Sequence, residues 1–320
     1  MTALLEVEDL RVSFATPQGP LHAVDGLSFS LERGSVLGLV GESGCGKSAT
    51  ASALCGLLPP LARTGGSVRL SGRELTTLPE SDWRTVRGSG ISMVFQDPMS
   101  SLNPLLSVGE HLVETLRAHL TLSRPAAADA AREWLFRVGI PDPSARLSNY
   151  PHELSGGMRQ RVMIALALCP GPDVLVADEP TTALDVTIQA QILDLLASLR
   201  EELGMAMIFI THDLGVVERV ADRIAVMYAG RVAEEGPASE LLQAPRHPYT
   251  AGLLASVPGF RKRTGRLPSI PGSVPSPRDW PTGCRFHPRC ERADDICRAE
   301  IPPAPGPSGG AACFHPKEAP

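Results

Sequence analysis

The sequence lacks several features that define common protein classes. No apolar run in its 320 residues approaches the roughly 20 residues of a membrane-spanning helix. The net charge is only −5, so the basic excess that is usual in nucleic-acid-binding proteins is missing. The first residues, "MTALLEVEDL", show no basic region followed by an apolar stretch, and we expect no secretory signal. With 43% hydrophobic residues, we expect a soluble cytoplasmic protein with one large domain and a second, smaller part.

A glycine-rich stretch, "GESGCGKSAT", stands between the apolar run "SVLGLV" and the helical segment "ASALCGLL". From Gly41, four residues lead to Gly46, Lys47 and Ser48, which fits the phosphate-loop pattern G-x-x-x-x-G-K-[ST]. Such a turn aims backbone N–H groups and a helix N-terminus at phosphate, Lys47 adds a charge, and the Ser48 hydroxyl would hold Mg²⁺. The flanking strand and helix disfavour the alternative, a turn with a solvated lysine. The predicted nucleotide-binding residues here are Gly41, Glu42, Ser43, Gly44, Cys45, Gly46, Lys47, Ser48 and Ala49.

Short apolar runs separated by helical patterns predict an α/β domain with a mainly parallel sheet. The expected buried strands are residues 35–41, 91–96, 173–180, 205–213 and 223–230. The stretch from about 104 to 170 has no such run and shows helical spacing, which predicts a helical insertion.

Two acids end the apolar strand in "VLVADEP". Beside a phosphate loop, Asp178 suits the Mg²⁺ shell and Glu179 suits polarising the attacking water. Gln96, at the end of "ISMVFQ", is positioned in the sequence to reach the metal or the water. The alternative is a pair of acids in a solvated turn, which the phosphate loop disfavours.

The stretch "LSGGMRQR", residues 154 to 161, resembles the signature of the ATP-binding cassette (ABC) ATPases. The resemblance extends over about residues 4 to 236. It implies a phosphate-loop NTPase core with an antiparallel β subdomain and a helical subdomain at about 100–170, all within residues 1–257. It also implies that the signature contacts the γ-phosphate of ATP held by a second subunit. The residues it adds are Ser155, Gly156 and Gly157 of the signature, Phe14 stacking on adenine, Gln96 of the Q-loop, Asp185 of the D-loop and the switch histidine His212.

Longer stretches look like the ATPase subunits of dipeptide, oligopeptide and nickel importers: "QDPMSSLNPLLSVGEHL", "LSGGMRQRVMIALAL" and "APRHPYTAGLLASVP". This resemblance implies an ATPase at the cytoplasmic face of the cell membrane that powers peptide import. Its implied partners are a paralogous ATPase subunit, two transmembrane permease subunits and an extracytoplasmic solute-binding protein. The alternatives are an importer of nickel or another small solute, and a soluble ABC ATPase acting on nucleic acid, which usually has two cassettes or long insertions.

The last segment, residues 258–320, differs in composition and is expected to be a small irregular extension. It holds 13 of the 30 prolines and little apolar material, so it needs a cross-link to fold. Four clustered cysteines without a C-x-x-C pair suggest metal in a cytosolic protein. Four thiolates suit Zn²⁺ or a 4Fe-4S cluster; the importer resemblance favours the cluster. The predicted ligands are Cys284, Cys290, Cys297 and Cys313, with His287 and His315 as possible substitutes, whereas Cys45, Cys55 and Cys169 are interpreted as packing residues.

Overall fold

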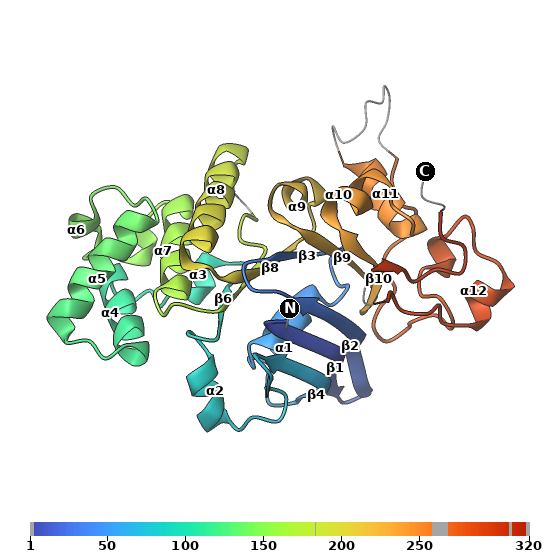
Figure 1. Cartoon of the computed structure of the whole chain (residues 1–320), viewed down its shortest axis with the longest axis horizontal. Helices are drawn as coiled ribbons and strands as arrows, with labels where there is room; N and C mark the ends of the chain where they lie inside the picture. The colour runs from blue at the N-terminus through green and yellow to red at the C-terminus, as the bar shows by residue number, and fades with distance from the viewer. Residues whose placement is uncertain (1–2, 183, 258–267, 307–308, 318–320) are drawn as a thin grey trace. The chain divides into compact units, whose positions relative to one another are not determined.

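The chain divides into two compact units in the computed structural model, which describes residues 3–182, 184–257, 268–306 and 309–317. The first unit combines Met1–Thr77 with Ile208–Pro320, and the second unit is Leu78–Met207. Figure 1 colours the chain from blue at the N-terminus to red at the C-terminus, so blue and orange-red elements belong to the first unit.

An antiparallel sheet in the first unit has the strand order β2-β1-β4-β5. Apolar residues alternate with polar ones along its strands, and Val7 pairs with Phe29 on one side and Val68 on the other. Because side chains alternate between the two faces of a strand, this pattern buries one face, and helix α1 (Lys47–Leu54) packs near the sheet. The expected antiparallel subdomain is confirmed. The strands are β1 (Leu5–Thr16), β2 (Gly19–Leu31), β4 (Ala62–Leu70) and β5 (Arg73–Glu74).

A second sheet carries the buried apolar strands of the first unit. Strand β3 (Val36–Val40), buried at every residue, pairs in parallel with β9 (Arg223–Tyr228), and β10 (Arg231–Pro237) continues the sheet antiparallel. Strands without polar positions are expected where both faces are covered. The helices of this unit before its C-terminal segment are α1 (Lys47–Leu54), α9 (Leu214–Val220), α10 (Ala238–Gln243) and α11 (Pro248–Ser256).

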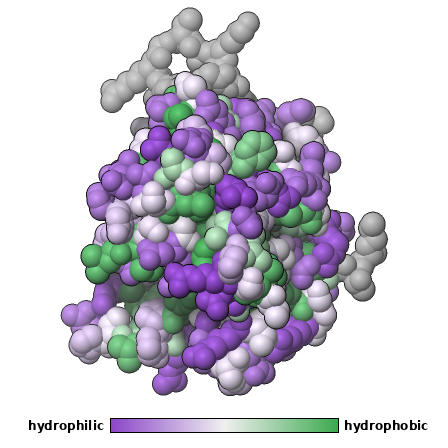
Figure 2. Space-filling view, turned by 90° about the vertical axis from the view of Figure 1, so that its left-hand side faces the viewer, coloured by the Kyte–Doolittle hydropathy of each residue, from purple (hydrophilic) through white to green (hydrophobic). Residues whose placement is uncertain are grey.

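The second unit contains a parallel strand pair and a group of helices. Strand β6 (Ile91–Val94) pairs in parallel with β7 (Val174–Asp178), as the apolar runs predict. Hydrophobic residues form small groups among hydrophilic ones on the face drawn in Figure 2. The helices are α2 (Glu80–Val86), α3 (Pro98–Ser101), α4 (Val108–His119), α5 (Arg124–Arg137), α6 (Pro143–Arg146), η1 (Pro151–Glu153), α7 (Gly156–Leu168) and α8 (Val186–Leu203).

Side-chain caps explain where several of these helices begin. Ser107 and Glu110 form a capping box at the start of α4, which satisfies N–H groups that the first turn cannot pair internally. The predicted helical insertion at about 104–170 is thus observed as α4 to α7. After α8, strand β8 (Ala206–Thr211), buried throughout, spans the boundary between the units.

The C-terminal segment of the first unit, residues 268–306 and 309–317, is mostly irregular, as its proline content predicts. It contains η2 (His287–Arg289), α12 (Asp295–Ala299) and the short strand β11 (Gly310–Ala311), which pairs with β10. The first residues of the predicted extension, 258–267, lie outside the described residues. None of the helices that the structure describes is long and apolar enough to cross a membrane.

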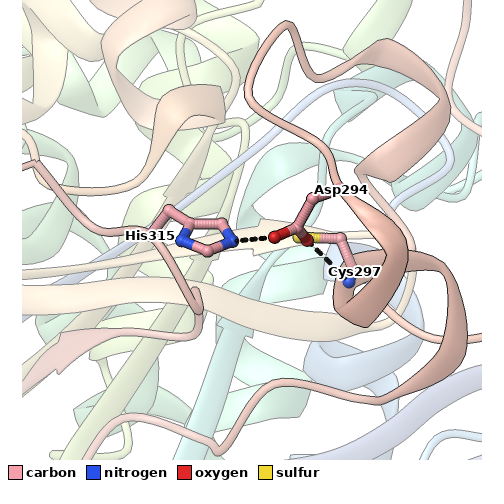
Figure 3. Close-up of side chains that lie close together, drawn as sticks. All are labelled: Asp294, Cys297 and His315. Atoms are coloured by element: carbon pink, nitrogen blue, oxygen red, sulfur yellow. Dashed lines mark hydrogen bonds and ion pairs between the residues drawn. The ribbon is translucent and has the colours of Figure 1, made fainter.

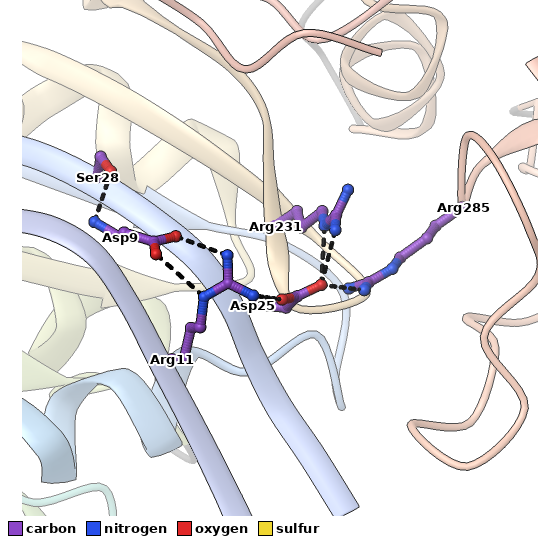
Figure 4. Close-up of polar contacts among 6 residues, drawn as sticks. All are labelled: Asp9, Arg11, Asp25, Ser28, Arg231 and Arg285. Atoms are coloured by element: carbon purple, nitrogen blue, oxygen red, sulfur yellow. Dashed lines mark hydrogen bonds and ion pairs between the residues drawn. The ribbon is translucent and has the colours of Figure 1, made fainter. Parts of the chain in front are cut away.

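A cluster of charges attaches this segment to the strands. Arg285 pairs with Asp25 of β2, which also contacts Arg231 of β10 and Arg11 of β1, each at 2.8 Å (Figure 4). Burial alone would raise the pKa of Asp25, but the bonds and charges of Arg231 and Arg285 outweigh it and hold the pKa below its usual value. The carboxylate is therefore charged and links three parts of the chain.

Candidate functional site

The glycine-rich loop connects β3 to α1 with the backbone that its composition predicts. Gly44 and Gly46 have φ values of 82° and 108°, which side chains other than glycine rarely adopt. Gly41 is needed for space, because a Cβ there would lie 2.3 Å from the Met227 oxygen. Cys45, within the loop, is fully buried. The glycines therefore allow a tight turn against β9.

Lys47 begins α1 and is only 5% exposed. Its ammonium donates hydrogen bonds to the carbonyl oxygens of Gly41 at 2.7 Å and Glu42 at 3.2 Å. A buried ammonium needs such partners, and here they come from the loop itself. Ser43, Gly44 and Ser48 are exposed, so the loop presents N–H groups and a hydroxyl to solvent beside a held positive charge.

Glu42 has contacts that motif spacing does not reveal. Its N–H donates to the Tyr249 hydroxyl at 3.0 Å, and its carboxylate forms an ion pair with Arg289 at 2.7 Å. Tyr249 belongs to α11 and Arg289 to η2, far along the chain. In the sequence, the only local signal of this contact is a basic residue, Arg289, directly before the clustered Cys290.

The other two predicted residues of the first unit lie on different elements. Phe14 is half-buried in β1, opposite Leu21 and Ala62. His212 is exposed and directly follows β8. Their predicted roles, Phe14 stacking on adenine and His212 acting as the catalytic switch histidine, stay predictions.

The second unit brings together the two strand-end residues that were predicted to act on water. Gln96 follows β6 and its amide donates to the Glu179 carboxylate at 3.3 Å; Thr182 donates to the same oxygen at 2.8 Å. Glu179 has a φ of 48°, a left-handed conformation that costs a non-glycine residue about 1–2 kcal/mol. Such strain clusters at functional sites. Asp178, the last residue of β7, is 4% exposed.

The predicted signature forms the start of α7. The Ser155 hydroxyl accepts from the Met158 N–H at 3.3 Å, so Ser155 is the N-cap. Ser155 and Gly156 are exposed, and a Cβ on Gly156 would meet nothing closer than 4.0 Å. Asp185 caps α8 in the same way, accepting from Ile188 N–H at 2.9 Å. The first residues of both helices, α7 and α8, are therefore not covered by other described parts of this chain.

The four clustered cysteines surround one small cavity in the first unit. Cys284, Cys290, Cys297 and Cys313 all line it, and His287 and His315 lie at its wall. The Cys284 N–H bonds the Cys297 carbonyl at 2.8 Å, which holds two distant ligands together. None of the seven cysteines forms a disulfide. The predicted grouping of these thiols is therefore seen among the described residues.

A polar trio lies at the edge of this cavity (Figure 3). Asp294 accepts from the Cys297 N–H at 3.2 Å and contacts the His315 ring nitrogen Nε2 at 2.8 Å. Burial comes first among the causes that raise the pKa of the Cys297 thiol. The three ligand atoms of this trio lie within 4.8 Å of one another.

The buried cysteines elsewhere behave as the packing residues that were expected. Cys55 is buried, and burial raises the pKa of Cys169 to about 12 and the pKa of Cys45 in the same direction. A thiol with a raised pKa carries little thiolate at neutral pH and is unreactive.

Comparisons with known proteins extend over both units. A model of the ABC transporter family matches residues 24–182, and a model of the oligopeptide/dipeptide transporter C-terminal region matches residues 233–297. The oligopeptide transport ATP-binding protein OppD of Salmonella typhimurium is 51% identical, covering 98% of this chain and 94% of the relative. The dipeptide transport ATP-binding protein DppD of Bacillus subtilis is 49% identical, covering 94% and 91%. A solved structure, the ATP-binding cassette MJ0796 bound to ADP and Pi, aligns with a TM-score of 0.66 and 27% identity, covering 73% of this chain and 98% of the other.

Proposed function

This chain belongs to the ABC transporter ATPases, and from that premise we propose that it hydrolyses ATP to power the import of oligopeptides or dipeptides. Near-full-length identity to OppD and DppD supports the peptide substrate. The single observation that carries the ATPase function is the phosphate loop with its buried Lys47. The alternative cargo, nickel or another small solute, is supported only by family resemblance.

The site residues divide the work by their chemistry. The loop, Gly41 to Ala49, holds the phosphates through N–H groups and Lys47. Phe14 stacks on adenine, while Ser48, Gln96 and Asp178 supply oxygen ligands that suit Mg²⁺. Glu179 orients the attacking water, and Gln96 and Thr182 hold its carboxylate. His212, together with Glu179, assists the in-line attack of water on the γ-phosphate.

The signature and the D-loop serve a second ATPase subunit in this proposal. Ser155, Gly156, Gly157 and Asp185 face solvent or lie at exposed helix starts, so they are available to another chain's ATP. We propose that this chain pairs with a paralogous ATPase beneath two permease subunits, at the cytoplasmic face of the membrane. An extracytoplasmic binding protein would deliver the peptide.

Peptide uptake tests the cargo, and hydrolysis tests the site. Cells lacking this chain should lose uptake of a labelled tripeptide and regain it with the wild-type chain. Uptake of nickel but not of peptide would identify the alternative cargo.

In the assembled transporter, Glu179→Gln should lower the rate of ATP hydrolysis about a hundredfold to ten-thousandfold while ATP still binds. Glu201→Gln, at an exposed position on α8, is the matched control. A wild-type rate for Glu179→Gln would refute its role.

We further propose that the four clustered cysteines bind a 4Fe-4S cluster that cross-links the C-terminal segment. The donor set fits: four thiols line one cavity, and this segment has little apolar material to fold by burial. Four thiolates would also suit a single Zn²⁺ ion; the resemblance to the importer ATPases is what favours the 4Fe-4S cluster.

Metal content distinguishes the choices. Protein purified without oxygen should contain about four irons per chain and absorb broadly, as four-thiolate cubane ligation requires. Cys290→Ser should lower the iron content, whereas Cys55→Ser should not. One zinc and no iron would point instead to a zinc site, with the Asp294, Cys297 and His315 trio as one donor set. Four freely alkylated thiols in native protein would remove the metal.

A further inference from the structure

The C-terminal segment reaches the phosphate loop through one arginine. Arg289, directly before Cys290, forms a two-pronged ion pair with Glu42, with distances of 2.7 and 3.1 Å. Its other N–H groups donate to the carbonyl oxygens of Pro271 at 2.8 Å and Gly272 at 3.4 Å. Arg289 is 8% exposed. A guanidinium held on both sides fixes the position of its partner as well as its charge.

Glu42 is held at each of its polar groups. Its N–H donates to the Tyr249 hydroxyl at 3.0 Å, and its carbonyl accepts from Lys47 at 3.2 Å and from the Cys45 N–H at 3.3 Å. The carboxylate belongs to Arg289. Glu42 is therefore the junction between the loop lysine and the C-terminal segment, and a displaced Glu42 would displace the carbonyl that holds Lys47.

Aromatic packing supplies a second connection from the same segment. Phe286 lies 5.2 Å from the Tyr228 ring, edge to face, and 5.4 Å from the Tyr249 ring. Tyr249 is fully buried. Tyr249, which accepts the Glu42 N–H, is thus packed against the turn that carries Arg289. The contacts of Glu42 with Tyr249 and with Arg289 therefore both depend on the position of this turn.

We propose that Arg289 is a positioning residue for the phosphate loop, so that nucleotide affinity depends on the placement of the C-terminal segment. This goes beyond the proposed function, in which the segment is only cross-linked by metal. The contacts that carry the inference all lie within the first unit of one chain. It therefore concerns binding by the isolated chain and requires neither transport nor a metal cluster.

Calorimetric titration of the full-length chain with Mg-ADP tests the proposal without hydrolysis. Arg289→Met keeps much of the side-chain length and removes the charge; we expect about fivefold to thirtyfold weaker binding. Glu42→Gln should weaken binding similarly, and the double variant should be no weaker than either single one, because the two residues act through one contact. Arg298→Met, in the same segment and paired with exposed Asp295, should stay within about twofold of wild type.

A purely structural role for Arg289 would give a different result. Lower thermal stability with unchanged Mg-ADP affinity, or effects of Arg289→Met and Glu42→Gln that add, would overturn the proposal. If Arg289→Met fails to fold, Arg289→Lys keeps the charge but not the two-pronged geometry. Arg289→Lys is then combined with Glu42→Gln in the same double-variant comparison. An unchanged affinity for Mg-ADP, or effects of the two substitutions that add, would again overturn the proposal. In the assembled transporter, Arg289→Met should raise the KM for ATP and leave kcat near wild type.

Discussion

Two glycine-rich helix starts, the phosphate loop and the signature turn, differ in how the chain surrounds them. In the phosphate loop, Lys47 is buried and Glu42 is bonded at its N–H, carbonyl and carboxylate. In the signature turn, Ser155 caps its own helix while Ser155 and Gly156 stay exposed. Both present N–H groups suited to phosphate. Contacts within the chain hold the phosphate loop in place, whereas the signature turn is exposed to solvent.

This difference indicates which binding step each turn serves. A loop whose charge and backbone are already fixed loses little entropy when phosphate binds, so it suits binding by the chain alone. An exposed turn with space beside its glycine suits contact with a ligand carried by another subunit. The comparison predicts that changes in the first turn affect nucleotide binding by the isolated chain. Changes in the second should affect hydrolysis by the assembled transporter.

The largest expected effect on nucleotide binding is at the phosphate loop. Lys47→Ala should weaken Mg-ADP binding by the isolated chain roughly a hundredfold, or about 2.8 kcal/mol, because a charged contact to phosphate is lost. Lys317→Ala, at an exposed lysine of the same unit, is the control and should bind as wild type. Calorimetry measures both variants. Near wild-type binding by Lys47→Ala would mean that the loop is not the phosphate site.

A smaller effect is expected at the signature turn. Gly156→Ala has room for its Cβ, with the nearest atom at 4.0 Å, and replacing glycine inside a helix stabilises it slightly. The variant should therefore fold and bind Mg-ADP normally. Hydrolysis by the assembled transporter should still fall about tenfold, because in the proposed pairing the added methyl group would obstruct close approach of the phosphate held by the second ATPase subunit.

A matched replacement controls this second prediction. Gly236 has no atom within 4 Å of an added Cβ and an ordinary φ, so Gly236→Ala should hydrolyse ATP as wild type does. Full activity of Gly156→Ala in the transporter would break the comparison, because the exposed turn would then make no close contact with nucleotide.

The sequence predicts most of the fold and the local site, because those depend on short-range patterns. Apolar runs predict β3, β6, β7, β8 and β9, and Gly46-Lys47-Ser48 predicts the loop, since periodicity and motif spacing are local. The left-handed Glu179 and the contacts of Arg289 could not be predicted in the same way. Arg289 lies 247 positions from Glu42, and only the folded chain brings such residues together. The cysteine grouping was predictable from composition, but which backbone bonds hold it was not.

The smallest expected effect concerns Glu74, a hydrogen-bonded carboxylate outside the phosphate loop, and its contribution to the stability of the fold. Glu74 of β5 accepts hydrogen bonds from Ser67, from the Val68 N–H at 3.1 Å and from both the N–H and hydroxyl of Thr76. Burial alone would raise its pKa, but these bonds outweigh it and lower the pKa to about 2. A carboxylate with a lowered pKa stabilises the fold at neutral pH, and this contribution disappears as the pH falls from about 4.5 towards about 2.

Glu74→Gln should therefore lower the thermal unfolding midpoint by only about 2–4 °C at neutral pH, since solvent screens part of the effect. The difference from wild type should shrink as the pH falls through that range, because the wild-type carboxylate becomes protonated. Mg-ADP affinity should not change, in contrast to Glu42→Gln, although both acids belong to the first unit. Glu32→Gln, at an exposed position, is the control for charge removal. If Glu74→Gln lost Mg-ADP affinity, any destabilisation of the first unit would weaken nucleotide binding. The weaker binding expected of Glu42→Gln would then need no explanation from its position in the phosphate loop.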